Sequence, residues 1–367
     1  MALTLLSFTF MGFLVIGVPV AFAIGLSSIT AIMYEDLPLA VAFQQMTSGM
    51  NAFSFLAIPF FIFTGELMLY GGIADRIVAF AKSLVGHVRG GLGMSNVVAC
   101  TLFGGVSGSP VADVSAMGSV MIPMMKREGY HADYAVNVTT HAALVGALMP
   151  TSHNIIIYTL AAGGKVSIAA LIAAGVIPAL ILTLCNLAAA YFVARSRGYP
   201  AGTFPGWAIV GRSLVAATPG LFVVVLIIAG ILSGVFTATE SAAVAVLYAL
   251  ALTIFVYRSL TWDQFVRAAS KAVKTTGVVL LLIGISATFG YLISFYGVAE
   301  KTGELMASVS TSPWAIFLMV NVILFVLGTF LDMAATILIC TPIFLPICIC
   351  LLYTSPRPRD GLLSRMP

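Results

Sequence analysis

Long apolar stretches alternate with short polar ones along most of the chain. Residues 134–160 form an apolar stretch that is interrupted and predicts a broken pair of helices. The uninterrupted runs are each long enough to cross a bilayer as a helix, and they lie at 5–33, 53–70, 166–194, 213–232, 238–257, 276–295 and 314–330. Because a chain in lipid must satisfy its own backbone hydrogen bonds, runs of helical length predict an all-α integral membrane protein.

The composition excludes a soluble globular domain. The 367 residues are 60% hydrophobic and 8% charged, whereas soluble domains carry about 25% charged residues. The first apolar run has no basic segment before it and no cleavage pattern after it, which predicts a retained span instead of a signal peptide. The five cysteines lie in apolar segments without partners at zinc spacing, and are expected to be inert buried thiols.

Charged loop residues predict the topology. The net charge of +4 comes from loop lysines and arginines, which indicates membrane orientation and not nucleic-acid binding. The loop with Arg76, Lys82 and Arg89 is basic, whereas the loop with Glu300 and Glu304 is acidic. The positive-inside rule therefore places the N-terminus and residues 76–89 in the cytoplasm, and residues 300–304 on the other side.

One unit of sequence occurs twice. One constant offset relates four residues to four later ones of the same type: Gly65, Leu67, Gly72 and Ala74 to Gly290, Leu292, Gly297 and Ala299. The number of residues from Gly105 to Pro123 also equals that from Gly328 to Pro346. Because matching loops fall on opposite sides of the membrane, the pattern predicts inverted repeats, which are typical of secondary transporters. The alternative is a chance match between residues common in membrane helices.

The predicted domains follow from these repeats. They are an N-terminal span with a periplasmic loop at 1–52; a first repeat at 53–200, with a re-entrant hairpin at about 91–126 and a broken helix at about 134–160; connecting spans and a cytoplasmic basic arm at 201–275; a second, incomplete repeat at 276–350; and a tail at 351–367.

The most informative stretch is 90–130, where Gly104, Gly105, Gly108 and Pro110 interrupt an apolar segment. Such a segment cannot cross as one helix, so it predicts a re-entrant hairpin whose tip lies at mid-membrane. Unwound backbone at that depth is tolerated where it lines a cavity, and its carbonyls are hard ligands suited to Na⁺. Two tip serines add hydroxyl oxygens: Ser107 and Ser109. The alternative is small residues used for close helix packing.

A second break lies at 145–154. Glycine, proline and polar residues interrupt an apolar helix there: Gly146, Pro150, Thr151, Ser152, His153 and Asn154. If this break faces the hairpin tip, its carbonyls complete the same ion cage. The alternative is a plain proline kink whose backbone is satisfied by neighbouring helices.

Four carboxylates lie inside apolar segments: Glu66, Asp113, Glu240 and Asp332. Intramembrane acids are costly, and no lysine or arginine shares these spans, so each is a functional candidate. Asp113 and Asp332 each follow a glycine break, which suggests a role near an ion site or in capping a hairpin helix. For Glu66 and Glu240 the alternative is a position nearer the membrane interface.

Four blocks together resemble one known family. They are LAIPFFIFTGELM at 56–68, LFGGVSGSPVADVSAMGSVMIPMMKREGY at 102–130, GALMPTSHN at 146–154 and LGTFLDMAATILICTPIFLP at 327–346. They resemble the large transmembrane subunit (DctM/SiaM-like) of TRAP transporters, the tripartite ATP-independent periplasmic type. The likeness extends from residue 1 to about residue 350.

The resemblance implies an elevator-type importer in the bacterial inner membrane, driven by Na⁺ and without an organic cofactor. Each of its inverted repeats would contain a re-entrant helical hairpin and a broken helix. Its substrate would be an organic anion such as a C4-dicarboxylate or sialate. Its partners would be a small membrane subunit (DctQ-like) and a periplasmic substrate-binding protein (DctP-like). The implied first Na⁺ site comprises Ser107, Gly108, Ser109, Gly146, Met149, Pro150 and Thr151. The second begins at Gly328 and Asp332, and the implied substrate and hairpin residues are Ser107, Ser109, Asp113, Ser152, His153 and Asn154.

The sequence departs from the family pattern at two places. The second break has Pro150 followed by Thr151, where two successive prolines are more usual. After residue 350 the chain becomes polar and proline-rich, so we expect 351–367 to be a non-native tail. The C-terminal repeat would then be truncated and the second Na⁺ site incomplete.

Two alternative functions stay open at this point. One is an anion symporter of the same superfamily that works without a binding protein. A remote one is an intramembrane serine protease, because residues 105–108 read Gly-Val-Ser-Gly. That mechanism needs a histidine base, either His141 or His153, and it leaves the repeats unexplained.

Overall fold

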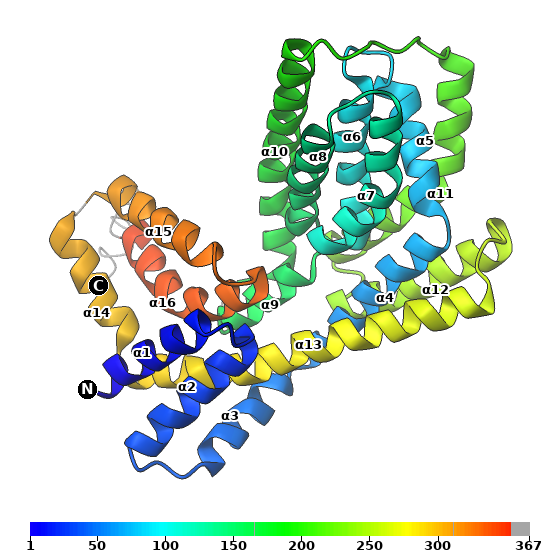
Figure 1. Ribbon diagram of the computed structural model, residues 1–367. Coiled ribbons are helices and arrows are strands. Elements are labelled where there is room, and N and C mark those ends of the chain that lie inside the picture. The colour runs from blue at the N-terminus through cyan, green and yellow to red at the C-terminus, as the bar shows by residue number, and fades with distance from the viewer. Residues whose placement is uncertain (165, 311, 354–367) are drawn as a thin grey trace, which may run out of the picture. The chain divides into compact units, whose positions relative to one another are not determined.

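The computed structural model describes residues 1–164, 166–310 and 312–353, with side chains throughout except at 307 and 350–353. Regular structure in this part of the chain is helical (Figure 1). Within it, five helices are long and apolar enough to cross a membrane, or six if the broken helix at 132–161 counts as one span. The predicted all-α, multi-pass class is therefore confirmed.

The helices group into two compact units. The first comprises Met1–Ala52, Ile157–Lys165 and Val278–Pro367, and the second comprises Phe53–Ile156 and Val166–Gly277. Two of the four boundaries between these ranges fall within helices, namely α9 (His153–Ala161) and α13 (Trp262–Phe295). The division into repeats that the sequence suggests remains a prediction.

The first unit begins with two helices, where the sequence predicted one span at 5–33. Helices α1 (Ala2–Val15) and α2 (Val20–Tyr34) pack against each other (Figure 1). The chain turns at Gly17, whose φ of 86° is accessible mainly to glycine. Pro19 then precedes α2 and has no N–H to continue a helix. The interpretation of 5–33 as one continuous helix was wrong because the uniform apolarity hid these local signals.

Helix α3 (Ala40–Met50) and the second half of α13 also belong to the first unit. Thr288 donates a buried hydrogen bond of 3.1 Å to the Ala42 carbonyl and so joins the two helices.

The remaining helices of this unit are α14 (Val298–Val309), α15 (Pro313–Gly328) and α16 (Met333–Tyr353). Helices α15 and α16 pack against each other around a break at 329–332, where the family resemblance implies the second hairpin. Of the predicted tail, residues 354–367 lie outside the described residues.

The second unit surrounds α6. Its helices are η1 (Phe53–Leu56), α4 (Ala57–Tyr70), α5 (Ile73–Val85), α6 (Gly91–Ser107), α7 (Pro110–Arg127), α8 (Ala132–Ala143), η2 (Leu144–Leu148), α10 (Ile168–Ser196), α11 (Trp207–Leu232), α12 (Ala238–Ala251) and η3 (Leu252–Val256), with the first parts of α9 and α13. Helix α6 packs against α4, α5, α7, α8, α10 and α11 (Figure 1). Phe103, near its end, is fully buried. The hairpin end of α6 is therefore fixed on several sides.

Glu240 has a local structural role. The Thr237 N–H donates to Glu240 Oε2 at 2.8 Å, and the Glu240 N–H donates to Thr237 Oγ1 at 3.3 Å. This reciprocal pair is a capping box, which satisfies two backbone donors at the start of α12. The side chain is exposed at the helix end. The described hydrogen bonds of Glu240 therefore give it a capping role at the start of α12.

Glu66 is neutralised by a residue from a distant part of the chain. It is buried in α4, and its Oε1 lies 3.0 Å from Lys271 Nζ on α13. The sequence predicted a helical span from residue 276, but α13 begins at Trp262 and so includes the basic residues that precede it. No lysine or arginine shares the apolar span of Glu66, and its counter-charge comes instead from a different helix. A ring contact between Phe63 and Phe265, 5.9 Å between centroids, joins the same two helices.

Removing the Lys271 ammonium should destabilise the second unit. We expect Lys271→Ala to lower the free energy of unfolding by about 1–3 kcal/mol, because Glu66 is left buried without a partner. Arg267→Ala is the matched control, one turn earlier, where the partner Asp263 is exposed; its effect should be under about 1 kcal/mol. Thermal unfolding in detergent measures both. Adding Glu66→Gln to Lys271→Ala should recover most of the loss, and equal losses in the two single variants would contradict the assignment.

Candidate functional site

The hairpin tip is built from residues that end one helix and begin another. Gly108 follows α6 with φ 61°, and its N–H donates to the Gly104 carbonyl at 2.9 Å. Glycine is favoured in this left-handed position because a side chain would clash with the backbone. Ser109 then caps α7, accepting from the Ala112 N–H at 3.5 Å, and Pro110 takes the first helical position. The predicted break therefore lies at Gly108 and Ser109.

The second break lies between η2 and α9, as predicted, at 149–152. Ser152 Oγ accepts from the Asn154 N–H at 3.3 Å and from Asn154 Nδ2 at 3.2 Å. This serine therefore provides a hydrogen-bond acceptor for a backbone N–H at the start of α9. Helix α10 passes close behind the break, since a β-carbon on Gly175 would lie 2.7 Å from the Leu148 carbonyl oxygen.

The two breaks meet. Thr151 Oγ1 donates to the Gly105 carbonyl at 3.0 Å. A β-carbon on Gly108 would overlap the Thr151 carbonyl and lie 2.6 Å from Ser152 N, and one on Gly104 would lie 2.7 Å from the Gly146 Cα. The structure thus brings together the tip and the broken helix, from which the residues of the predicted first ion site are drawn.

The junction of the breaks is buried and rich in oxygen. Ser107 is 5% exposed and Thr151 is 1% exposed. The C-terminal end of α6 carries a partial negative charge that favours a cation, and the N-terminal ends of α7 and α9 carry partial positive charges that favour an anion. The arrangement is chemically suited to holding a hard cation and an anionic group near one another. It also buries Asp113, whose carboxylate accepts a hydrogen bond from the Ser107 hydroxyl.

The partners of Ser107 do not form a protease centre. The described hydrogen bonds of its hydroxyl oxygen are those to Asp113 and from the Ser109 N–H, at 3.2 Å for the latter. His141, one nominated base, is exposed on α8, where its Nδ1 lies 2.8 Å from the Asn137 carbonyl. The Gly-Val-Ser-Gly sequence is therefore explained by the helix end.

The predicted second ion site lies in the first unit. Gly328 ends α15, and a β-carbon there would meet nothing within 4 Å. The exposed Asp332 accepts from the Ala334 N–H at 3.2 Å and so caps the start of α16. An apolar cavity of about 500 Å³ beside α15 and α16 includes Gly328 in its lining but not Asp332. The two residues are thus close in sequence but have different surroundings.

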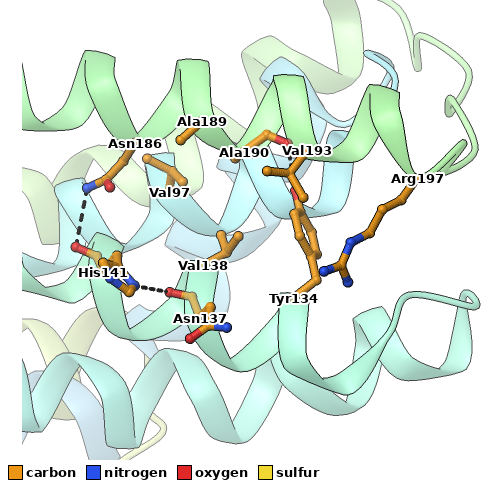
Figure 2. A pocket seen from close by; sticks show the side chains of 10 residues that line it. All are labelled: Val97, Tyr134, Asn137, Val138, His141, Asn186, Ala189, Ala190, Val193 and Arg197. Carbon is orange, nitrogen blue, oxygen red and sulfur yellow. Dashed lines mark hydrogen bonds between the residues drawn. The ribbon is translucent and has the colours of Figure 1, made fainter.

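Another pocket, of about 310 Å³, lies between α8 and α10 (Figure 2). Asn186 Nδ2 donates to the His141 carbonyl at 3.2 Å across it. At one end Arg197 forms an ion pair with Asp133, 2.8 Å between Nη2 and Oδ2. None of the residues predicted for the ion or substrate site lines this pocket.

Sequence reasoning missed the residues that support the site from behind. Asn96 on α6 donates to Thr139 Oγ1 on α8 at 2.6 Å, inside the core. A β-carbon on Gly65 of α4 would lie 3.2 Å from the Ser107 Cα. Two sequence features could have identified these residues. Asn96 is an amide within an apolar run, and Gly65 recurs as Gly290.

A side chain at Gly108 should separate the two breaks. We expect Gly108→Ala to be destabilising through left-handed strain and through overlap with the Thr151 carbonyl. Gly129→Ala is the matched control, because Gly129 has φ 84° but nothing within 4 Å of its β-carbon position. The loss at Gly108 should exceed that at Gly129 by about 1–3 kcal/mol, the usual cost of overpacking. Thermal unfolding in detergent measures the difference, and equal losses would contradict close contact between the breaks.

Comparison with known proteins identifies the family. The model of the DctM component of tripartite ATP-independent periplasmic transporters matches residues 7–352. The uncharacterized protein YgiK of Salmonella typhimurium is 40% identical, over 91% of this chain and 77% of its own length. The sialic acid TRAP transporter large permease SiaM of Vibrio cholerae is 37% identical, over 93% and 79%. The C4-dicarboxylate TRAP transporter large permease DctM of Rhodobacter capsulatus is 32% identical, over 91% and 79%. The chain therefore belongs to the DctM family of TRAP transporter components, and is a transporter subunit and not an enzyme.

Proposed function

We propose that this chain translocates an organic anion across the bacterial inner membrane, coupled to Na⁺, by an elevator movement. The observation that carries the proposal is the contact between two unwound segments, the hairpin tip at Gly108 and the helix break at Thr151. Unwound backbone deep in a membrane protein occurs where it is buried or lines a cavity, and it supplies oxygen ligands there.

The coupling ion would bind where these segments meet. Its ligands would come from the first-site residues predicted by the family resemblance: Ser107, Gly108, Ser109, Gly146, Met149, Pro150 and Thr151. Hydroxyl and carbonyl oxygens suit Na⁺, and the C-terminal end of α6 favours a cation. A second site beginning at Gly328 and Asp332 is part of the same proposal.

The substrate would be a carboxylate such as a C4-dicarboxylate or sialate. The similar permeases of Vibrio cholerae and Rhodobacter capsulatus are named for sialic acid and C4-dicarboxylate. The N-terminal ends of α7 and α9 offer backbone N–H groups and partial positive charge to such an anion. Ser152, His153 and Asn154 at the start of α9 are the proposed side-chain contacts.

The elevator mechanism rests on the two predicted repeats. Helices α5 and α14 each follow a left-handed glycine, Gly72 with φ 72° and Gly297 with φ 61°. Each is followed by a pair of helices around a break, α6 with α7 and α15 with α16. This shared order of elements supports one structural unit present twice, and the loop charges support opposite orientations with a cytoplasmic N-terminus.

The partners would be those of a tripartite system. The family is the DctM component of such transporters. We propose that a DctQ-like small membrane subunit accompanies this chain, and that a DctP-like periplasmic protein delivers the substrate. Much of the substrate specificity would then reside in the delivering protein.

Uptake of labelled organic acids into proteoliposomes tests the proposal. The liposomes contain this chain with the small subunit of its own system, and the cognate binding protein is added outside. We expect uptake to require both Na⁺ and the binding protein. Combining Ser107→Ala with Ser109→Ala should raise the Na⁺ concentration for half-maximal uptake about tenfold or more, equivalent to about 1.4 kcal/mol.

Ser119→Ala is the control for this pair. Ser119 lies on the exposed side of α7, and its hydroxyl donates to the Ala116 carbonyl at 2.8 Å within the same helix. Its Na⁺ dependence should match that of the unaltered protein. Uptake that is indifferent to Na⁺ would refute the coupling, and uptake without the binding protein would favour the symporter alternative.

A further inference from the structure

Asp113 is a buried acid with one free oxygen and, unlike Glu66, no ion-pair partner among the described residues. Its side chain is fully buried in the first turn of α7. Oδ1 accepts a hydrogen bond from the Ser107 hydroxyl, whereas Oδ2 is buried without a hydrogen-bond partner. Among the described residues, no lysine or arginine forms an ion pair with this carboxylate, unlike Glu66 with Lys271. A buried carboxylate with one hydrogen bond therefore lacks a protein counter-charge.

The free oxygen lies in a slot between two glycines. A β-carbon on Gly104 would lie 2.8 Å from Asp113 Oδ2, and one on Gly146 would overlap the same atom. Gly104 belongs to the hairpin and Gly146 to the broken helix. The carboxylate therefore contacts both segments whose junction is the proposed ion site, and glycine is required at both positions for it to fit.

Asp113 also determines how Ser107 can act as a ligand. A serine hydroxyl has one proton and two lone pairs. The Ser107 hydroxyl donates a hydrogen bond to Asp113, and one of its lone pairs accepts a hydrogen bond from the Ser109 N–H at 3.2 Å. One lone pair remains for a cation. Without Asp113 the hydroxyl could rotate and direct its proton toward the position of the ion.

We infer that Asp113 is the positioning residue and counter-charge of the coupling-ion site. It orients the Ser107 oxygen toward the ion, and its buried negative charge stabilises the ion through one intervening side chain. The inference rests on the proposed Na⁺ coupling. It assigns the charge of the site to a residue that does not touch the ion, with neutral hydroxyls and carbonyls as the direct ligands.

A purely structural role for Asp113 makes a different prediction. A carboxylate in the first turn of a helix interacts favourably with the helix dipole. That interaction stabilises the fold whether or not Na⁺ is present. A counter-charge for the ion acts on the part of the stability that depends on Na⁺, because a ligand stabilises a protein according to its concentration relative to its dissociation constant.

Thermal unfolding of the purified full chain in detergent separates the two roles. NaCl is varied against choline chloride at constant ionic strength. The Tm of the unaltered protein should rise with Na⁺ and give an apparent dissociation constant. Asp113→Asn keeps an oxygen that can accept from Ser107 but removes the charge. It should raise this constant on the order of tenfold or more, since coulombic attraction is strong in a buried site.

Two further variants complete the test. Ser119→Ala is the control and should titrate like the unaltered protein. Gly104→Ala keeps the charge but places a methyl group 2.8 Å from Oδ2, so that the carboxylate must shift, and it should also weaken Na⁺ binding. If Asp113→Asn does not fold, Gly104→Ala replaces it as the test variant.

The outcomes are distinct. An Asp113→Asn protein whose Na⁺ titration matches the unaltered one overturns the inference, even if its Tm is lower at every concentration. If Gly104→Ala replaces Asp113→Asn as the test variant, a Na⁺ titration that matches the unaltered protein likewise overturns the inference. If the unaltered protein has no Na⁺-specific rise in Tm, the proposed coupling fails and the inference fails with it. A Na⁺ response in the unaltered protein that is weakened in Asp113→Asn supports both.

Discussion

The structure depends on the need to satisfy backbone polar groups where water is scarce. A helix that ends in such surroundings leaves N–H and C=O groups without partners, and each orphaned group costs several kcal/mol in hydrocarbon. Here two helix ends are placed together, so that the Thr151 hydroxyl reaches the Gly105 carbonyl. Ser109 and Ser152 accept from backbone N–H groups at the starts of α7 and α9. The second break thus supplies a donor to the carbonyl end of α6, and each of the two following helices is capped by a serine of its own break.

Close approach of the breaks requires small residues on every side. Gly104, Gly108 and Gly146 allow backbone to touch backbone at the junction, and Gly65 and Gly175 allow α4 and α10 to pack against it. Any added methyl group would displace a segment that neighbouring helices hold in place. The junction is therefore closely packed, which supports the proposal of a preorganised ion site, because ligand oxygens that are already positioned need little rearrangement to bind.

The sequence located the breaks better than it located their partners. Gly108 with Pro110, and Pro150 with its polar neighbours, are local signals of helix ends, and both breaks were found where predicted. The partners of the carboxylates depend on contacts between distant segments. Glu66 meets Lys271 across about two hundred positions of sequence, and no local pattern announces such a pair. The turn at Gly17 was overlooked for the opposite reason, because a long apolar run outweighed one local signal.

Asp113 and Asp332 have similar positions in the sequence but different surroundings in the structure. Both follow a glycine break, and for both the sequence left open a role near an ion site or in capping a hairpin helix. Asp113 is buried because Gly104 and Gly146 pack against it, whereas Asp332 is exposed and caps its own helix. A buried carboxylate is costly without a nearby cation, whereas an exposed one is not. The burial of Asp113 therefore depends on a second break packed against the hairpin, and the hairpin sequence alone gives only one of the two segments.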